Sequence, residues 1–305
     1  MKPVTVRVPA KVNLQLGVGP LRDDGYHDLV NVFHAVSLFD EVTAVPADAP
    51  SVTVEAAPDA QVAIQNVPLD GGNLAMRAAR LLAERAGVEP NVELRIRKAI
   101  PVAGGMAGGS ADAAAALLAC ARLWKADLLL PALPELGAEI GSDVPFALLG
   151  ESAIGLGRGE RLTPLETSGT FHWVFATADG GLSTPAVYAE CDRLREARGE
   201  RVPWPPAYDE LAKALAAGDA RALGAALAND LQPAALSLRP SLRRTLDAGR
   251  ELGALGSLVS GSGPTTAFLA ESAEHAAGLA AALAGAGVAK QVVRAYGPVP
   301  GATVV

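Results

Sequence analysis

The chain has 305 residues, of which 50% are hydrophobic, and a formal net charge of −7. This length allows one large or two medium domains around a sizeable core. The negative balance and the lack of a basic run argue against nucleic acid or an anionic membrane as the main partner.

The first third of the sequence favours β-structure. Residues 1–8 alternate apolar and polar side chains, as a strand does, and show no signal-peptide pattern, so we expect a cytoplasmic protein. Leucine and alanine spacing predicts a helix over 73–82 that closes at Gly87. Apolar and β-branched runs predict strands at Val4–Val8, Leu14–Val18, Asn31–Ser37, Asp40–Val45, Val52–Glu55 and Val92–Ile96.

Further along, an apolar segment at 140–149 ends at Gly150, and from about Arg161 the composition shifts towards Pro, Leu and Ala. Residues 252–270 carry no charge, but their glycines and Pro264 favour a buried, turn-rich segment over a membrane span. The later pattern predicts a strand at Phe171–Thr177 and helices at 188–197, 208–216, 221–227, 242–251 and 275–283. We therefore predict an α+β fold with two lobes and a cleft between them: a strand-rich domain, 1–160, and a more helical domain, 161–305.

A glycine-rich loop at 100–112 leads directly into an alanine-rich helix at 113–120. Glycines let a backbone approach a ligand closely, and a helix start adds unpaired N–H groups, so the pattern indicates an anion site. A flexible turn before a helix is the simpler alternative. The dinucleotide pattern G-x-G-x-x-G fails at Met106 and Ala107, and the P-loop pattern finds Ser110 where its lysine belongs. A phosphate site here would need a cation from elsewhere in the fold.

Two short motifs near the N-terminus carry polar side chains in suggestive positions. In residues 9–14, Lys11 and Asn13 share one face of a strand, while Val12 and Leu14 point towards the core. A solvated strand face is the alternative. Residues 23–28 place Tyr26 and His27 side by side on a turn, which could equally be a plain hairpin tip.

Two later motifs and the cysteines complete the candidates. Asp143 stands between small and apolar residues, which suits either a catalytic base or the N-cap of a short helix. Residues 260–265 form a second glycine loop, usable for phosphate or as a turn. Cys120 reads as a core residue, and no Cys/His spacing typical of a metal site is present.

Three of these motifs together resemble those of the GHMP kinases. They are P-A-K-x-N-L at 9–14, P-x-x-x-G-x-x-G-G-S-A-D at 101–112 and S-G-S-G-P-T at 260–265. Two more, D-G-Y-H-D-L at 24–29 and G-S-D-V-P-F at 141–146, resemble the member of that superfamily that acts on a cytidine diphosphate ester of methylerythritol. The resemblance runs in order from Pro9 to Thr265.

The resemblance implies a two-lobed GHMP kinase that uses ATP and Mg²⁺ to phosphorylate the 2-hydroxyl of that small-molecule substrate, for isoprenoid synthesis without mevalonate. Lys11 and Asp143 would be the catalytic pair, with the aspartate taking the hydroxyl proton. The erythritol end would meet Asn13, and the cytosine would meet Tyr26, His27 and, less closely matched, Tyr188. The residues implied for ATP are Asn73, Leu74, Pro101, Val102, Ala103, Gly104, Gly105, Met106, Ala107, Gly108, Gly109 and Ser110.

Some points stay open at this level. Ala103 and Ala107 stand where some members have glycine. Asp112 could cap the helix or face Mg²⁺. A mevalonate or homoserine kinase is one alternative, although it would have no use for the Tyr26–His27 pair. A protein that only binds its ligand is another, although it would not need the Lys11–Asp143 pair.

Overall fold

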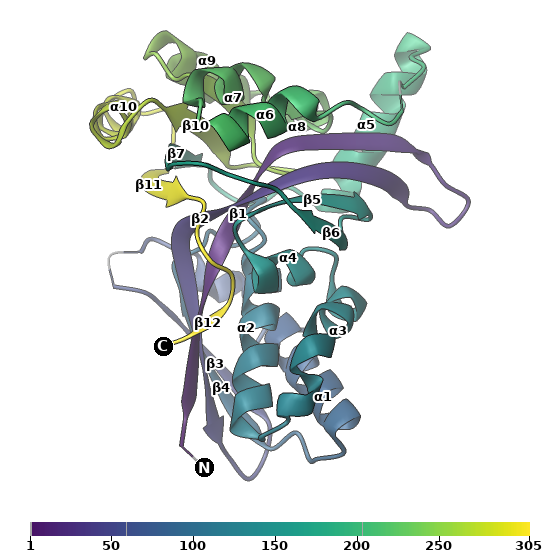
Figure 1. Ribbon diagram of the computed structural model, residues 1–305. Helices are drawn as coiled ribbons and strands as arrows, with labels where there is room; N and C mark the ends of the chain where they lie inside the picture. Colours follow the sequence, from purple (N-terminus) through teal and green to yellow (C-terminus); the bar gives the residue numbers. More distant parts are fainter. Residues whose placement is uncertain (1, 59, 203) are drawn as a thin grey trace.

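The computed structural model describes residues 2–58, 60–202 and 204–305, which form a strand-rich lobe and a more helical lobe. In Figure 1 the first lobe lies below and the second above, joined by two long strands. This arrangement confirms the predicted α+β class. The helices of the first lobe are α1 (Leu74–Ala86), α2 (Gly108–Leu123), α3 (Leu133–Ile140) and α4 (Val144–Leu149), with short 3₁₀ turns at Ile64–Asn66 and Asp127–Ala132.

The larger sheet has eight strands within the described residues, and its main path runs β12-β1-β2-β4-β3. Strand β5 pairs with β2 and with β6, and β8 pairs with β1. Because β6 and β12 belong to this sheet, it takes in residues on both sides of the boundary predicted at residue 160. The strands are β1 (Val4–Leu21), β2 (His27–Pro46), β3 (Ser51–Ala56), β4 (Val92–Lys98), β5 (Ser152–Gly157), β6 (Arg161–Pro164), β8 (Ala228–Asn229) and β12 (Thr303–Val304).

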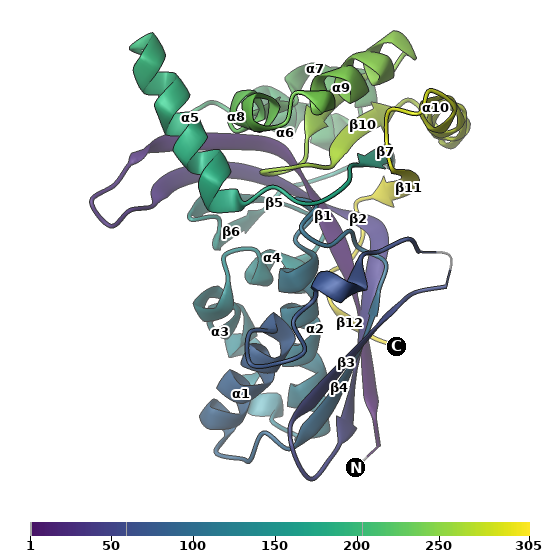
Figure 2. The ribbon, with the colours of Figure 1, turned by 180° about the vertical axis from the view of Figure 1, so that it is seen from behind.

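Strands β1 and β2 are each continuous, so the prediction of two separate strands in each region was wrong. The breaks in the apolar pattern are register shifts inside the pair, at Pro9/Ala10, Asn13/Gln15 and Val18/Leu21. A bulge bends a strand and changes the face of the sheet on which its following side chains lie, but it does not end the strand. The resulting hairpin runs from the core of the first lobe to a tip beside α5 (Figures 1 and 2). The predicted turn at 23–28 is the tip of this hairpin.

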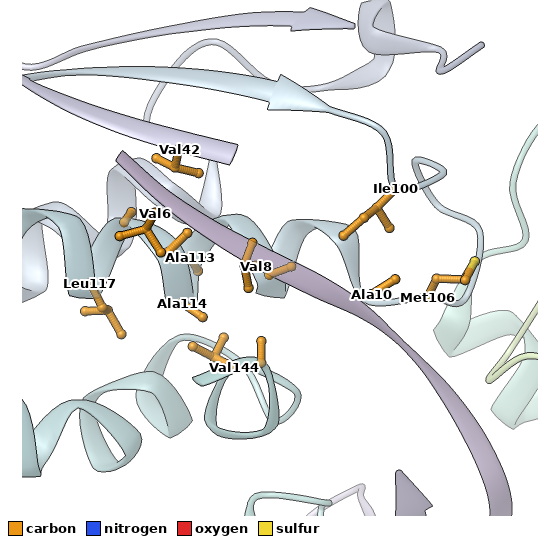
Figure 3. Packing of buried hydrophobic residues seen from close by; sticks show 14 of the residues in the cluster. Val6, Val8, Ala10, Val42, Ile100, Met106, Ala113, Ala114, Leu117 and Val144 are labelled. Atoms are coloured by element: carbon orange, nitrogen blue, oxygen red, sulfur yellow. The ribbon is translucent and has the colours of Figure 1, made fainter. Parts of the chain in front are cut away.

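The core of the first lobe forms where α2 packs on the sheet. Figure 3 shows valines of β1 and β2 facing the alanines of α2, with Ile100 and Met106 at one end. Residues 113–117 of α2 are all fully buried. Because alanine side chains are small, the helix can approach the sheet closely. The apolar helix that the sequence predicted after the glycine loop therefore lies in the middle of the lobe. Its buried position also fixes the glycine loop that precedes it.

The second lobe is built on an antiparallel sheet in the order β11-β7-β10-β9. Strand β7 (Phe171–Thr177) has the predicted bounds, whereas β9 (Gly256–Val259), β10 (Thr266–Ala270) and β11 (Gln291–Gly297) were not predicted. Residues 252–270 thus form two strands and a turn, and most of them are buried, as expected. Helix α8 (Gln232–Leu238) was also not predicted. The helices are α5 (Thr184–Arg198), α6 (Asp209–Ala217), α7 (Ala220–Ala226), α8 (Gln232–Leu238), α9 (Ser241–Glu251) and α10 (Ala273–Gly285).

None of the helices in the described parts of the chain is long and apolar enough to cross a membrane.

Candidate active site

A cavity of about 1150 Å³ lies between the hairpin, the glycine loop, α5 and the second glycine loop. It brings together segments from both lobes, and most of the predicted site residues line its wall. Those residues are Lys11, Asn13, Tyr26, His27, Leu74, Ala103, Gly104, Gly105, Ala107, Gly108, Gly109, Ser110, Asp143 and Tyr188.

Lys11 and Asn13 lie on one face of β1, as their spacing predicted. The Lys11 ammonium donates hydrogen bonds to Asn13 Oδ1 at 2.5 Å and to the Gly105 carbonyl at 3.1 Å. It also lies 3.9 Å from Oδ2 of Asp143. Burial lowers the pKa of Lys11, and the charge of Asp143 opposes that shift. Lys11 thus brings an ammonium group from β1 to the glycine loop, which has no cation of its own.

Asp143 occupies the N-cap position of α4, but its side chain makes no capping hydrogen bond. Its side chain is 28% exposed and faces the cavity. The capping alternative would need a carboxylate oxygen bonded to a backbone N–H of the first turn. The structure instead leaves the carboxylate free for a ligand, next to Lys11.

The glycine loop has three residues in the left-handed region of backbone space. They are Ala103 at φ 52°, Gly105 at φ 78° and Ala107 at φ 61°. This region disfavours a residue with a Cβ by roughly 1–2 kcal/mol, which explains why glycine suits positions 103 and 107. Helix α2 begins at Gly108 with no side-chain cap. Its first-turn N–H groups are therefore available to an anion in the cavity.

The second glycine loop packs against the first. The Ser260 hydroxyl donates to the Gly105 carbonyl at 3.1 Å, and the Thr265 N–H donates to the Gly104 carbonyl at 3.3 Å. A Cβ on Gly105 would lie 2.1 Å from the Ser260 carbonyl oxygen, so only glycine fits there. Gly261 also lines the cavity. The second loop thus supports the first and forms part of the cavity wall.

The hairpin tip and α5 form the far end of the cavity. His27 is buried, and its ring stacks on Tyr188 with centroids 5.4 Å apart. Nδ1 of His27 lies 2.8 Å from the Gly19 carbonyl, which can only accept, so Nδ1 carries the hydrogen. Nε2 lies 3.3 Å from a carboxylate oxygen of Asp192. Tyr26, beside it, is 54% exposed. Tyr188, whose match to the family pattern was less close, thus contacts His27 of the predicted Tyr26–His27 pair.

Asp192 and Arg158 are among the cavity residues that were not predicted from the sequence. Asp192 lies one helical turn after Tyr188, a spacing that places both on one face of α5 and could have suggested it. Arg158 reaches the cavity from the turn between β5 and β6, and no motif in the sequence marked it.

Four of the residues implied for ATP do not line the cavity. The Asn73 side chain caps α1 by accepting from the N–H groups of Ala75 and Met76, and Met106 is fully buried in the core. Pro101 and Val102 also lie outside the lining. Direct contact of these four with ATP stays a prediction, but the side chains of Asn73 and Met106 have structural roles.

Asp112 does not cap α2; it belongs to a buried ion cluster with Asp40 and Lys98 and does not line the cavity. The Lys98 ammonium pairs with Asp40 Oδ2, with Asp112 Oδ2 at 2.7 Å and with the Gly108 carbonyl at 3.3 Å. Asp40 Oδ1 accepts the N–H groups of Ala99 and Ile100. Burial raises the pKa of Asp112, and the nearby Asp40 adds to that shift against the opposing charge of Lys98. The cluster lies under the glycine loop and ties the start of α2 to the sheet.

Among the described residues, no group of three or more His, Cys, Asp or Glu could hold a metal ion. Mg²⁺ in phosphate sites needs only one or two protein oxygens, because phosphate and water supply the rest. The Ser110 hydroxyl and the Asp143 carboxylate both line the cavity beside the loop and fit that requirement. Cys120 and Cys191 are buried and unpaired with each other.

Comparison with known proteins gives consistent results. The family model described as "GHMP kinases N terminal domain" matches residues 73–151, and "GHMP kinases C terminal" matches residues 211–289. Two proteins named 4-diphosphocytidyl-2-C-methyl-D-erythritol kinase, from Thermobifida fusca and Streptomyces avermitilis, are 62% and 63% identical to this chain. Each match covers 99% of this chain, and 98% and 99% of the respective relative.

Solved structures agree with these matches. A crystal structure titled 4-(cytidine 5'-diphospho)-2C-methyl-D-erythritol kinase superposes with a TM-score of 0.75 at 34% identity, covering 95% of this chain and 98% of the other. The crystal structure of L. major mevalonate kinase superposes with a TM-score of 0.72 at 17% identity, over 95% of this chain and 94% of the other. The second likeness shows a shared fold only.

Proposed function

The chain belongs to the 4-diphosphocytidyl-2-C-methyl-D-erythritol kinase family of GHMP kinases and is an ATP-dependent kinase. From this premise we propose that Lys11 and Asp143 carry out the transfer of the γ-phosphoryl group of ATP to the 2-hydroxyl of 4-diphosphocytidyl-2-C-methyl-D-erythritol. The observation that supports these roles best is the Lys11–Asp143 pair, 3.9 Å apart, on the wall of the cavity that also holds the glycine loop.

The reaction forms a bond between the substrate oxygen and the γ-phosphorus and breaks the bond from that phosphorus to the β,γ-bridging oxygen. Asp143 takes the hydroxyl proton, and ADP leaves. Lys11 gives the carboxylate a counter-charge and offers a cation to the transferring phosphoryl group. Its hydrogen bonds to Asn13 and Gly105 fix the ammonium in place, and such positioning supplies most of the catalysis in phosphoryl transfer.

ATP lies along the glycine loop in this proposal. The loop N–H groups and the uncapped start of α2 receive the phosphates, and Leu74 meets the adenine end. Ser110 would hold Mg²⁺ together with phosphate and water oxygens, and the ion would neutralise phosphate charge when bound. A protein with a negative net charge can bind two anionic ligands in this way, because the N–H groups and cations that contact them lie in the cavity itself.

The substrate occupies the rest of the cavity. Asn13 contacts the erythritol end, next to Lys11. The cytosine binds at the hairpin tip, where Tyr26 stacks on the base, His27 hydrogen-bonds to it and Tyr188 closes the other side. The exposure of Tyr26 supports this role, because about half of the residue is accessible to a ligand.

Turnover of purified protein with ATP and a panel of alcohols tests the proposal. The panel contains the cytidine diphosphate ester, free methylerythritol, mevalonate and homoserine. We expect ADP release with the ester alone, and loss of that activity in Asp143→Asn. Equal activity on free methylerythritol or mevalonate would refute the substrate assignment, whereas the assignment of the protein as a kinase would stand. Nucleotide binding without turnover of any alcohol would favour a protein that only binds its ligand.

A further inference from the structure

Arg158 is a cavity residue to which neither the sequence motifs nor the proposed chemistry assigns a role. It lies on the turn between β5 and β6 and is half-buried. Its backbone N–H donates to Glu160 at 2.7 Å, which holds the turn. Its guanidinium carbon lies 5.6 Å from the ring centroid of Tyr26, so the side chain points along the cavity towards the hairpin tip.

Strand pairing places Arg158 close to the tip of the hairpin. Gly157, its neighbour, pairs with Leu29 on β2, two residues from His27. Asn13, at the catalytic end, pairs with Phe33. At about 3.3 Å per residue, Leu29 lies roughly 7 Å from His27 and about 13 Å from Phe33 along the strand. Figure 1 shows β5 and β6 running beside this part of the hairpin.

Arg158 has no carboxylate partner among the described residues, although its guanidinium faces the ring of Tyr26. In the described chain, Lys11 and Arg158 are the Lys and Arg residues of the lining, against the carboxylates of Asp24, Asp143 and Asp192. Lys11 is engaged with Asn13 and Asp143, whereas Arg158 makes no ion pair among those residues. A guanidinium presents a planar fork of donors that matches phosphate oxygens. A guanidinium beside the Tyr26 ring with no carboxylate partner suits an anion attached to a base bound at the tip.

We propose that Arg158 binds the diphosphate of the cytidine diphosphate ester. The proposal rests on the proposed function, because that substrate carries its diphosphate between the base and the reacting alcohol. Arg158 contacts a part of the substrate that does not react, so it contributes to binding and leaves the chemical step unchanged. The competing explanation is that Arg158 only supports the ring of Tyr26.

Titration calorimetry with cytidine, CMP and CDP separates the two explanations. All titrations contain saturating β,γ-imido-ATP, which keeps the pyrimidine ligands out of the ATP site. We expect wild type to bind CDP more tightly than cytidine. Arg158→Gln should weaken CDP binding about ten-fold or more and leave cytidine affinity unchanged, since hydrogen bonds to charged groups have about this effect. Unchanged cytidine binding also shows that the variant is folded.

Arg161→Gln is the matched control, because Arg161 is exposed and outside the cavity, three residues along the chain. It should bind all three ligands as wild type does. In turnover, Arg158→Gln should raise KM for the ester with little change in kcat. Equal weakening of cytidine and CDP would overturn the proposal in favour of support for Tyr26, and unchanged CDP affinity would overturn it outright. Failure of the proposed function is distinct, since wild type would then not turn over the ester.

Discussion

Replacing Lys98 by methionine should destabilise the protein although Lys98 contacts no ligand. Methionine keeps most of the side-chain volume but removes the cation from the buried ion cluster. The Lys98 side chain is 2% exposed, and those of Asp40 and Asp112 are 0% and 5% exposed. Removing one partner of a buried pair costs about 3–5 kcal/mol. Asp40 keeps its two backbone donors, so we expect the low end of this range, about 3 kcal/mol, or roughly a hundred-fold larger unfolded fraction.

Urea unfolding followed by circular dichroism measures this loss. Lys213→Met is the control, because the exposed Lys213–Glu210 pair should contribute under about 1 kcal/mol. The double variant Lys98→Met/Asp112→Asn should recover part of the loss, since it removes one unpaired carboxylate. A loss below about 1 kcal/mol in Lys98→Met, or a double variant less stable than the single one, would refute the reasoning.

The same variant should show a defined pH dependence. Burial already holds the pKa of Asp112 above its ordinary value in the folded state, and loss of Lys98 raises it further. A carboxyl with a raised folded pKa takes up its proton on folding, so acid favours the folded state at this site. Because the pKa of Asp112 is already about 8 in the wild type, the stability difference between wild type and Lys98→Met should shrink as pH falls from about 10 to about 8 and stay level below that. A difference that grows over this range would contradict the assignment.

Three further variants test the site. Asp143→Asn should bind ATP normally and lose about 10²- to 10⁴-fold in kcat, and near-normal turnover would remove Asp143 as the base. Gly108→Val should weaken β,γ-imido-ATP binding in calorimetry, because a Cβ there lies 3.1 Å from Ile100 and 3.2 Å from the Lys98 ammonium; an unchanged affinity in a folded variant would make the loop a simple turn. Tyr26→Ala should raise KM for the cytidine ester about ten- to a hundred-fold with KM for ATP unchanged, whereas the equally exposed Tyr296→Ala should change neither; equal effects of the two would contradict a stacking role.

Local patterns predicted the site residues that lie close together in sequence. The two-residue spacing of Lys11 and Asn13 placed them on one face, and the glycines before α2 marked the loop. The meeting of Lys11 with Asp143 depends on β1 passing the start of α4, which no local spacing encodes. The resemblance to GHMP kinases supplied that pair, and the structure supplied its geometry.

Other features depend on tertiary context. Pro9 interrupts the apolar pattern, yet β1 continues through it because a register shift absorbs the change. Strands β9 and β10 are short and lie among glycines, so periodicity did not identify them. Asp112 follows a phosphate loop and therefore suggested a cap or a metal ligand. Its partner Lys98 comes from the preceding strand, and the third member, Asp40, lies far away in sequence.

The unbroken hairpin has a consequence for how substrates are selected by length. In the proposed function, the base binds at the hairpin tip and the reaction takes place at Lys11, and both points stand on the same two paired strands, so the strand length sets their separation. An alcohol attached to its nucleoside through a shorter or longer linker would bind at one end and miss the other. Removing two residues from β2 between His27 and Phe33, and two from the paired part of β1 between Asn13 and Leu21, would shorten that separation by about 7 Å while keeping every side chain on its face. In the proposed function, the number of residues between two points on a strand therefore sets the length of substrate that fits.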